Sequence, residues 1–541
     1  MSAAGRYWHT VRHLKPIQLY GRVLFRLARP RIDGRDAPPR RTVSRPWVAP
    51  ASRPISMTGP DRFRFLNEEH SLSDHGWADS RLPKLWNYNL HYFDDLNALG
   101  AESRASWHAP LLTRWVRENS PGAGTAWEPY PTSLRIVNWI KWALAGHSLE
   151  PACLTSLAVQ ARWLGVRLER HLLGNHLFAN AKALVFAGLF FEGAEAGGWL
   201  ARGLRILAQE MPEQVLGDGG QFERSPMYHA LAFEDVLDLV NIAAVYGRAV
   251  EAQQWRSVAE TMQDWLAAMC HPDGEIGFFN DAAIGIAPSP SELFAYAQRL
   301  GFRRPAAAAP SLLLADSGFI RLQAGDATVL LDVGPVGPDY LPAHAHADTL
   351  SFELSLRERR VFVNSGTSLY APGPERERQR GTAAHNTVEI DGQNSSEVWG
   401  SFRVARRARI RNLSLSTGDP LVARCMHDGY SRLPGRPLHR RTWRLRPDEL
   451  MIEDGVTARA ESSVARFHLH PDVGISETGR DGVRLVVPDV GAVVVTVVDG
   501  ILAVEDSTWH PGFGLAMPNK CLRVSFQGPL LRTTIRWGAG S

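Results

Sequence analysis

Three histidines lie within one short stretch of this 541-residue chain, Asp339 to Trp399, and imidazole side chains can transfer protons or bind metal ions. His344 and His346 are two residues apart, and His385 follows after Asn364. The surrounding sequence, which includes TLSFELSL and RVFVN, alternates apolar and polar residues as strands do. Because alternate side chains on a strand point to the same side, His344 and His346 are expected to line one wall of a site. The set could hold a cation, or it could consist of hydrogen-bonded histidines at the rim of a sheet.

A second polar cluster begins an otherwise apolar segment, GNHLFANAKALVFAGLFF (174–191). Asn175, His176 and Asn180 crowd its start, and His176 and Asn180 share one face of the expected helix. Asn175 could cap this helix, a role that asparagine fills well, or it could face a ligand.

A third cluster lies in LGDGGQFERSPMYHALAFEDVLDL (216–239), where a glycine-rich turn leads into another expected helix. Its polar residues include Glu223, Arg224, Tyr228 and His229. Backbone donors at a helix start can face a ligand. Tyr228 could instead be a core residue, but the polar density around it argues against full burial.

Helices are expected to carry the second and third clusters. Eight segments between residues 84 and 270 repeat apolar residues at i, i+3 and i+4, the spacing of helices with one buried face. They are residues 84–99, 106–118, 133–147, 154–172, 176–193, 199–211, 226–247 and 254–270. Successive helices of this length, joined by connectors with Gly, Pro and Asp, predict an α/α toroid that forms an incomplete barrel.

Strands are expected to carry the histidine cluster. Beyond an Ala- and Pro-rich junction at 301–316, short alternating segments separated by turns predict an antiparallel β-sandwich. The expected fold class is therefore multidomain α+β, with the toroid first and the sandwich second. The expected boundaries are 1–75 for an N-terminal segment, 76–305 for the toroid and 306–541 for the sandwich.

The N-terminal segment combines a helical stretch with a linker. His9 to Arg29 is basic and amphipathic, and Pro38 to Pro60 is rich in Pro and Arg. Such a helix can contact a membrane surface or a partner, or it can pack on the main body, which is the favoured interpretation.

The overall composition, 44% hydrophobic and 21% charged, is that of a globular protein with sizeable cores. A net charge of +4 gives no argument for nucleic-acid binding, and no nucleic-acid partner is expected. The four cysteines are far apart and predict neither a disulfide framework nor a zinc knuckle. No secretory signal and no apolar run of membrane-spanning length are visible. A cytoplasmic location is the simplest expectation, or the periplasm or cell envelope if export uses another route.

Six motifs in order carry a resemblance to a known family: AWEPYPTSLRIVNW, GNHLFANAKAL, DGGQFERSPMYH, HAHADTLSFEL, VNSGTSLY and RGTAAHNTVEIDG. Together they resemble the heparinase II/III family of polysaccharide lyases, from about residue 80 to past 400. The N-terminal half is also similar to branches encoded with bacterial exopolysaccharide biosynthesis. The resemblance implies cleavage of an acidic, uronic-acid-containing polysaccharide by β-elimination, without an organic cofactor.

The resemblance also implies roles for particular residues. The carboxylate of the sugar must be neutralised, and Asn175 and His176 are expected to hold it. Tyr228 is expected to exchange protons as base, acid or both, and His344 to take part in proton transfer. As a base, Tyr228 would need cationic neighbours, and Arg224 and His229 are close in sequence.

Further residues are expected at the cleft or around a cation. The substrate-binding candidates are Arg135, Glu223, Arg224, His229, Tyr370 and His385. By resemblance, His346, Asn364 and His385 correspond to the ligands of one divalent cation, zinc or calcium. Asn364 stands where relatives have Asp, and a neutral amide is a weak zinc ligand, so His385 could contact substrate instead.

Three functions remain open at this point. The first is a lyase acting on an acidic exopolysaccharide. The second is a non-catalytic, glycan-binding member of a polysaccharide assembly system. The third, a glycoside hydrolase on a similar toroid, would need two carboxylates across the cleft, for which Asp218 and Glu223 are available.

Overall fold

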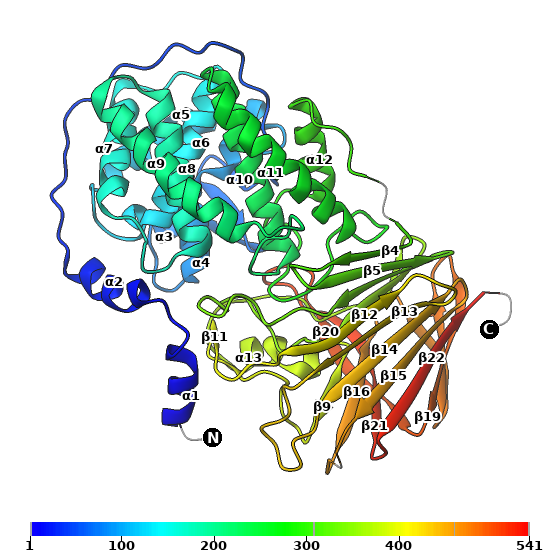
Figure 1. The fold of residues 1–541 in the computed structure, drawn as a ribbon. Coiled ribbons are helices and arrows are strands. Elements are labelled where there is room, and N and C mark those ends of the chain that lie inside the picture. Colours follow the sequence, from blue (N-terminus) through cyan, green and yellow to red (C-terminus); the bar gives the residue numbers. More distant parts are fainter. Residues whose placement is uncertain (1–2, 307–308, 459, 539–541) are drawn as a thin grey trace.

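The computed structural model describes residues 3–306, 309–458 and 460–538, in which a helical domain precedes a β domain (Figure 1). The helices of the main helical domain are α4 (Lys84–Tyr92), α5 (Ala105–Glu118), α6 (Pro129–Leu144), α7 (Pro151–Val166), α8 (Gly174–Phe190), α9 (Gly193–Gln214), α10 (Pro226–Val245), α11 (Ala249–Ala268) and α12 (Pro290–Arg299). They form an open α/α toroid, not a closed barrel, as the periodicity predicts. Helix α12, which was not predicted from the sequence, lies beyond the last of the expected helical segments.

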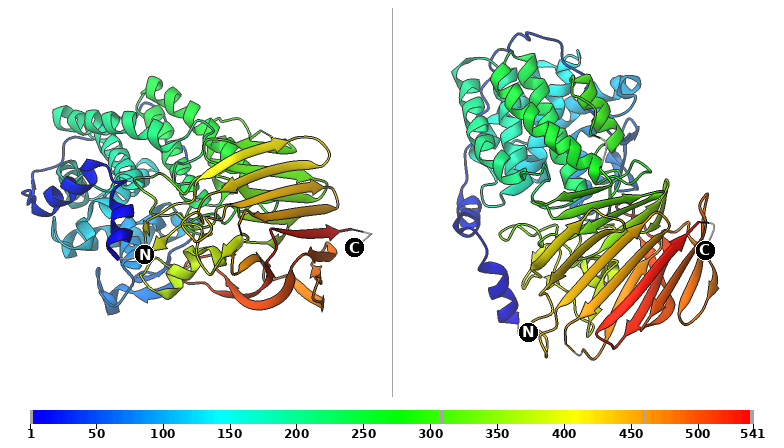
Figure 2. Two further views of the ribbon diagram at one scale, coloured as in Figure 1. Left: turned by 60° about the horizontal axis from the view of Figure 1, so that its bottom comes forward. Right: turned by 45° about the vertical axis from the view of Figure 1, so that its right-hand side comes forward.

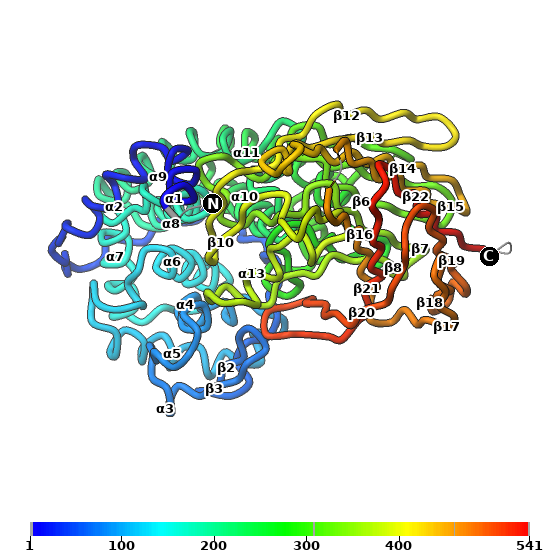
Figure 3. The backbone as a smooth tube through the Cα atoms, turned by 90° about the horizontal axis from the view of Figure 1, so that it is seen from below, coloured from blue at the N-terminus to red at the C-terminus, as the bar shows by residue number. Residues whose placement is uncertain are grey.

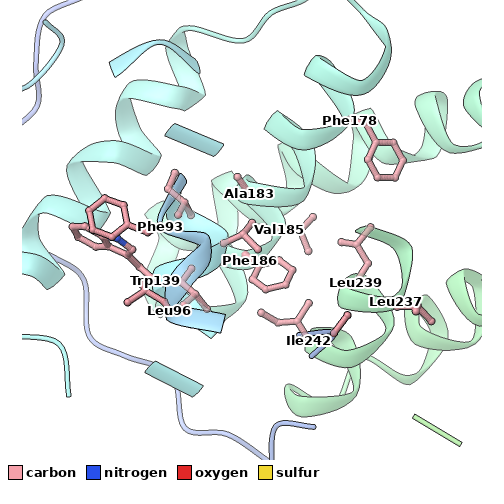
Figure 4. Packing of buried hydrophobic residues seen from close by; sticks show 14 of the residues in the cluster. Phe93, Leu96, Trp139, Phe178, Ala183, Val185, Phe186, Leu237, Leu239 and Ile242 are labelled. Atoms are coloured by element: carbon pink, nitrogen blue, oxygen red, sulfur yellow. The ribbon is translucent and has the colours of Figure 1, made fainter. Parts of the chain in front are cut away.

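Helix α8 is buried within the toroid because, apart from Asn180 and Lys182, its sequence after His176 is apolar on every side. Every residue from Leu177 to Phe190 is buried. Figure 4 shows Ala183, Val185 and Phe186 of α8 packed between Trp139 of α6 and Ile242 of α10. Asn175 and His176, which precede the buried part of α8, therefore lie at one end of the toroid.

The β domain is a sandwich of antiparallel sheets. One layer is an eight-stranded sheet in the order β12 (Ile410–Ser416), β13 (Leu421–His427), β14 (His439–Arg446), β15 (Glu449–Val456), β22 (Leu530–Trp537), β19 (Gly491–Val498), β18 (Gly482–Val487) and β17 (Gly474–Thr478). The other contains β4 (Ser311–Leu314), β5 (Phe319–Ala324), β6 (Ala327–Asp332), β7 (Phe352–Leu356) and β8 (Arg359–Phe362). This five-stranded sheet meets a four-stranded sheet through the bridge Phe362–Leu469. The latter has the order β20 (Ile501–Trp509), β21 (Met517–Phe526), β16 (Ser463–His468) and β9 (Val388–Ile390).

The two layers share one core, in which Val329 and Phe352 of the five-stranded sheet join Trp443 and Ile452 of the eight-stranded sheet. Figure 2 shows the layers lying face to face below the helical domain. The expected antiparallel β-sandwich is confirmed.

Three arginines of the β domain tie it to the segment that follows α11. Arg321 donates to the carbonyls of Ala268 and Cys270, at 3.1 and 2.7 Å. Arg360 donates to the Asp273 carboxylate, and Arg376 donates to the Asp281 carboxylate. The segment 268–281 is thus a shared boundary: it packs in the core of the toroid and binds arginines of the β domain.

The N-terminal segment forms two helices, α1 (Ala3–Val11) and α2 (Pro16–Leu27), where one helix over 9–29 was expected. The break has a local cause, since Lys15 precedes a proline and has the extended conformation (φ −66°, ψ 144°) that this position favours. An extended stretch then runs along the outside of the toroid (Figure 1). It leads into a small sheet of β1 (Met57–Gly59), β2 (Arg62–Phe65) and β3 (Glu68–Ser71), followed by α3 (Leu72–His75), none of which was predicted.

Candidate active site

An aspartate that sequence reasoning did not identify, Asp281, lies at the centre of the polar cluster between the domains. Its carboxylate is fully buried and accepts hydrogen bonds from His344 Nδ1 at 3.0 Å and His346 Nε2 at 2.9 Å. Arg376 Nη2 and the Thr367 hydroxyl also donate to it, at 2.7 and 3.2 Å. Although burial alone would raise it, the charge of Arg376 and the hydrogen bonds of the histidines hold the pKa of Asp281 well below its usual range.

The ionised Asp281 determines how His344 can act. A carboxylate only accepts hydrogen bonds, so the Nδ1 atom of His344 must carry the proton. In the neutral ring, Nε2 then has a free lone pair, as in a histidine oriented by an aspartate in a catalytic triad. Nε2 faces the site, 3.7 Å from Glu223 Oε2. This arrangement makes His344 suited to accept a proton from a substrate.

The two histidines lie in a loop, so the prediction that they share one face of a strand is wrong. They nevertheless reach the same carboxylate, because other contacts fix the loop. The amide of His346 donates to the Asn280 side chain at 2.9 Å, and the amide of Asp281 donates to the carbonyl of His344 at 2.9 Å. Arg380, at the end of α13 (Pro374–Arg380), donates to the Ala345 carbonyl at 2.8 Å.

Tyr228 comes from the toroid and stacks on His344 from the β domain, with ring centroids 3.8 Å apart. Ser225 caps α10 by accepting from the Tyr228 amide, which fixes the tyrosine in the first helical turn. The Tyr228 hydroxyl lies 3.0 Å from the Tyr370 hydroxyl. Tyr228 is only 9% exposed, so most of its side chain is buried at the edge of the toroid core.

The pKa of Tyr228 lies well above its ordinary value, mainly because of burial and then because of Tyr370, Asp281 and Glu223 nearby. Tyr228 therefore rests as a neutral phenol that can donate a proton. Arg224 and His229, which were expected to lower the pKa of Tyr228, make other contacts. Arg224 donates to the Ser317 carbonyl at 2.8 Å, and the ring of His229 lies between the Met262 carbonyl and a backbone amide.

The expected carboxylate-binding pair begins helix α8. Gly174 has φ +54°, and a Cβ at this position would lie 2.4 Å from a methyl of Leu341, so only glycine fits here without strain. Leu173 is the N-cap, which places Asn175 inside the first turn and excludes the capping alternative. Asn175 is half-buried, and among the described residues no hydrogen-bond partner holds its side chain.

His176 has a side chain that is 31% exposed, packs against Tyr130 and lies 3.1 Å from a Glu169 oxygen. Burial opposes its protonation, but the charge and hydrogen bond of Glu169 raise the pKa of His176 overall. Glu169 also accepts from Asn180 and is itself fixed by it. A histidine held in this way favours its cationic form, which suits the binding of an anionic group.

Glu223 links the two halves of the site. It is buried, and its charge acts on both His344 and His176. Burial raises the pKa of this carboxyl above its usual value. Asp218 is the other carboxylate considered for hydrolysis. It accepts hydrogen bonds from the amide and hydroxyl of Ser317 and from the amide of Gly220, so its side chain stabilises the local turn and does not face the site.

The structure therefore brings five of the sequence-predicted residues together: His176, Glu223, Tyr228, His344 and Tyr370. Asn175 precedes His176 in the first turn of α8. Phe402, which is 40% exposed, and Phe513 flank Tyr370 with their rings 5.3 and 4.8 Å away. Phe513 is buried, but an exposed aromatic face such as that of Phe402 can stack on a sugar ring.

Arg135, Arg224 and His229 do not belong to this group. Arg135 has no exposed surface, donates to Gln160 and stacks over Trp115 at 3.9 Å. His229 is equally buried, and burial lowers its pKa to about 3. Burial therefore removes Arg135 and His229 from the surface that a substrate could reach. Arg224 is half-buried, and its guanidinium donates to the carbonyls of Ser317 and Asp316 instead of facing Tyr228.

The proposed cation ligands lie behind Asp281. His346 Nδ1 and His385 Nε2 are 3.2 Å apart, and both rings are buried. The Asn364 side chain is engaged by the Asn386 amide and by Ser351. In the part of the chain that the structure describes, no group of three His, Cys, Asp or Glu side chains is arranged to hold a metal. Two nitrogens and an engaged amide fit a divalent cation poorly, and no step of the chemistry below uses one.

Comparison with known proteins is consistent with this architecture. Residues 79–294 match the family described as Heparinase II/III N-terminus, and residues 306–538 match the one described as Heparinase II/III-like, C-terminal. A heparin-sulfate lyase of Bacteroides stercoris is 30% identical over 304 residues, which cover 50% of this chain and 45% of that lyase. The chain thus spans less than half the length of that lyase.

Two further relatives cover more of the chain. The FtsZ-localized protein C of Caulobacter vibrioides (strain NA1000 / CB15N) is 25% identical over 425 residues, 73% of this chain and 71% of that protein. A solved structure of a heparinase III gene product superimposes with a TM-score of 0.65 at 21% identity, covering 85% of this chain and 80% of its own. The structural match supports the toroid and sandwich.

Proposed function

Because the chain belongs to the heparinase II/III-like family, we propose that it is a polysaccharide lyase that cleaves a uronic-acid-containing polymer by β-elimination. The observation that carries this proposal is the stack of Tyr228 on His344, which joins a proton donor from one domain to a proton acceptor from the other. The acidic polymer that we propose as substrate is a bacterial exopolysaccharide.

In the proposed reaction, His344 Nε2 removes the proton from C5 of the uronate. The electrons of that C–H bond form the C4–C5 double bond, and the bond from C4 to the glycosidic oxygen breaks. The departing oxygen takes the proton of the Tyr228 phenol, so protons and electrons balance. Asn175 and cationic His176 bind the carboxylate and stabilise the charge that develops on it.

The shared stack also favours one stereochemistry. With the two rings in one stack, we propose that base and acid act from the same side of the sugar. A uronate in which the C5 hydrogen and the C4 oxygen are cis, as in glucuronate, fits this arrangement better than iduronate, in which they are trans.

One observation favours a second candidate, non-catalytic glycan binding. Tyr228 is hydrogen-bonded to Tyr370, and Tyr228 and His344 are each only 9% exposed. A sugar must separate these tyrosines before it can meet the proton donor. A binding protein would need no such opening, and it would hold the polymer through the exposed ring of Phe402.

The two candidates are separated by incubating the protein with defined glucuronate polymers and following the ultraviolet absorbance of an unsaturated product. Tyr228→Phe should lower the rate by about 10²- to 10⁴-fold, the usual contribution of a general acid. Tyr246→Phe is a matched control, since Tyr246 caps the far end of the same helix, about 27 Å away at 1.5 Å per residue. Polymer binding without product would support the second candidate, and equal rates for Tyr228→Phe and the native protein would refute the proposed mechanism.

A further inference from the structure

The two N-terminal helices form an arm, residues 3–27, at one edge of the molecule (Figures 1 and 3). Helix α2 packs on the toroid through Gly21 and Phe25, both against His171, with 4.4 Å between the Phe25 and His171 rings. Helix α1 packs on the β domain, where the indole N–H of Trp399 donates to Thr10 at 3.2 Å. The arm is therefore held against both domains.

The face of α2 that points away from the protein is apolar. Its five large side chains are 49 to 72% exposed: Leu19, Tyr20, Val23, Leu24 and Leu27. Their spacing of i, i+1, i+4, i+5 and i+8 gathers them on one side of the helix, opposite the buried Gln18 and Gly21. Helix α1 repeats the pattern with three side chains that are 40 to 66% exposed: Tyr7, Trp8 and Val11. A helix of a soluble domain normally turns such a face inward.

The charges of the arm and the residues just after it are all positive. From residue 3 to 32 the basic side chains are Arg6, Arg12, Lys15, Arg22, Arg26, Arg29 and Arg31, and the first acidic residue is Asp33. At 100° per residue, Arg22 and Arg26 border the apolar face of α2 on one side. Both are exposed.

We propose that this arm docks the protein on the surface of an anionic lipid bilayer. The apolar face of α2 and the exposed Trp8 would enter the boundary between headgroups and acyl chains, while the arginines pair with anionic headgroups. Leu and Val side chains bordered by arginine, with no acidic residue in the segment, match an interfacial helix. They match an acidic polysaccharide poorly, because a glycan is held by aromatic rings and hydrogen-bond donors and not by aliphatic side chains.

Docking would be peripheral. Among the described residues, no helix is long and apolar enough to cross a membrane. Helix α2, at 12 residues, would span about 18 Å at 1.5 Å per residue, less than the hydrocarbon thickness. The arm would therefore lie in the plane of the surface.

The test is sedimentation of the full chain with vesicles of phosphatidylcholine alone and of phosphatidylcholine mixed with phosphatidylglycerol. We expect binding to the mixed vesicles, loss of binding at high salt, and little binding to phosphatidylcholine alone. The double variant Leu24→Glu/Leu27→Glu should bind roughly tenfold or more weakly. Val250→Glu is the matched control, because Val250 is 69% exposed on α11 and should tolerate the charge without loss of binding.

Several outcomes would overturn the proposal. They are equal binding by the double variant and the control, equal binding to both vesicle types, and no binding to mixed vesicles by the native protein. If the double variant instead changes the mass measured by light scattering without vesicles, the face is a contact between copies of the chain. Circular dichroism confirms that each variant is folded. Tyr228→Phe should bind vesicles like the native protein, which separates docking from lyase activity.

Discussion

Replacing Asp281 with asparagine should damage both stability and catalysis, because one carboxylate serves five donors. Oδ1 contacts His346, Thr367 and Arg376, and Oδ2 contacts His344 and Arg376. An asparagine turns one of these oxygens into an NH₂ group that faces donors. Either His344 or His346 must then change its tautomer, and Arg376 loses one of its hydrogen bonds.

The magnitude follows from burial. Arg376 and Asp281 have no exposed surface, and removing one partner of such a pair costs about 3–5 kcal/mol of the free energy of unfolding. If the change of tautomer falls on His344, Nε2 carries the proton and can no longer accept one, which predicts a rate loss on the order of 10³- to 10⁴-fold. Asp281→Asn should therefore lower stability and activity together.

Stability is measured by urea unfolding, followed by tryptophan fluorescence, and activity by the absorbance of the unsaturated product. Because the pKa of Asp281 is depressed, its stabilisation is fully present above the ordinary carboxyl pKa and is lost only as pH falls through the depressed value. The stability difference from the native protein should thus stay constant from about pH 5 to pH 8. Asp326→Asn, in the exposed pair with Arg357, is the control and should cost at most about 1 kcal/mol. A cost for Asp281→Asn as small as that of the control would refute the reasoning.

Three further substitutions test separate parts of the site. Glu169→Gln removes the charge that raises the pKa of His176. His176 should then lose its proton at a lower pH, so KM for an anionic polymer should begin to rise at a lower pH than in the native protein. An unchanged pH profile of KM would contradict the proposed binding role of His176. Gly174→Ala should cost about 1–3 kcal/mol by chemical denaturation, because its φ is positive and its Cβ would meet the β domain; unchanged stability would show that the close approach is not needed. Arg135→Met should change the unfolding midpoint but not KM, and a raised KM in folded protein would restore Arg135 to the cleft.

The sequence motifs identified where two helices of the candidate site begin, but not the residues that surround the site. The motifs that contain Asn175 and Tyr228 lie at the N-terminal ends of α8 and α10. The structure places Tyr228 against His344, which is 116 positions away in the chain. Asp281 and Arg376 were missed because their contacts join segments separated by 63 to 95 residues, a distance over which local spacing carries no information. The short turn FFNDAAIG, polar within apolar flanks, was the available signal for Asp281.

Local spacing also could not determine the direction in which a polar side chain points. Arg135 and His229 lie on helices beside functional motifs, yet tertiary packing turns both into the core. The cation site remains a prediction, since the residue types suggest ligands while the observed hydrogen bonds already occupy Asn364.

The contacts of the segment 268–281 determine how the two domains could be separated. If the toroid and the sandwich were made as separate polypeptides, Arg321, Arg360 and Arg376 would each lose the carbonyl or carboxylate that they bind across the interface. Each fragment alone would then expose unpaired charged groups and the apolar side chains that the two domains bury against each other. Mixing two such fragments, one ending after α12 and one beginning with the first strand of the sandwich, would test whether these contacts are enough to reassemble the site.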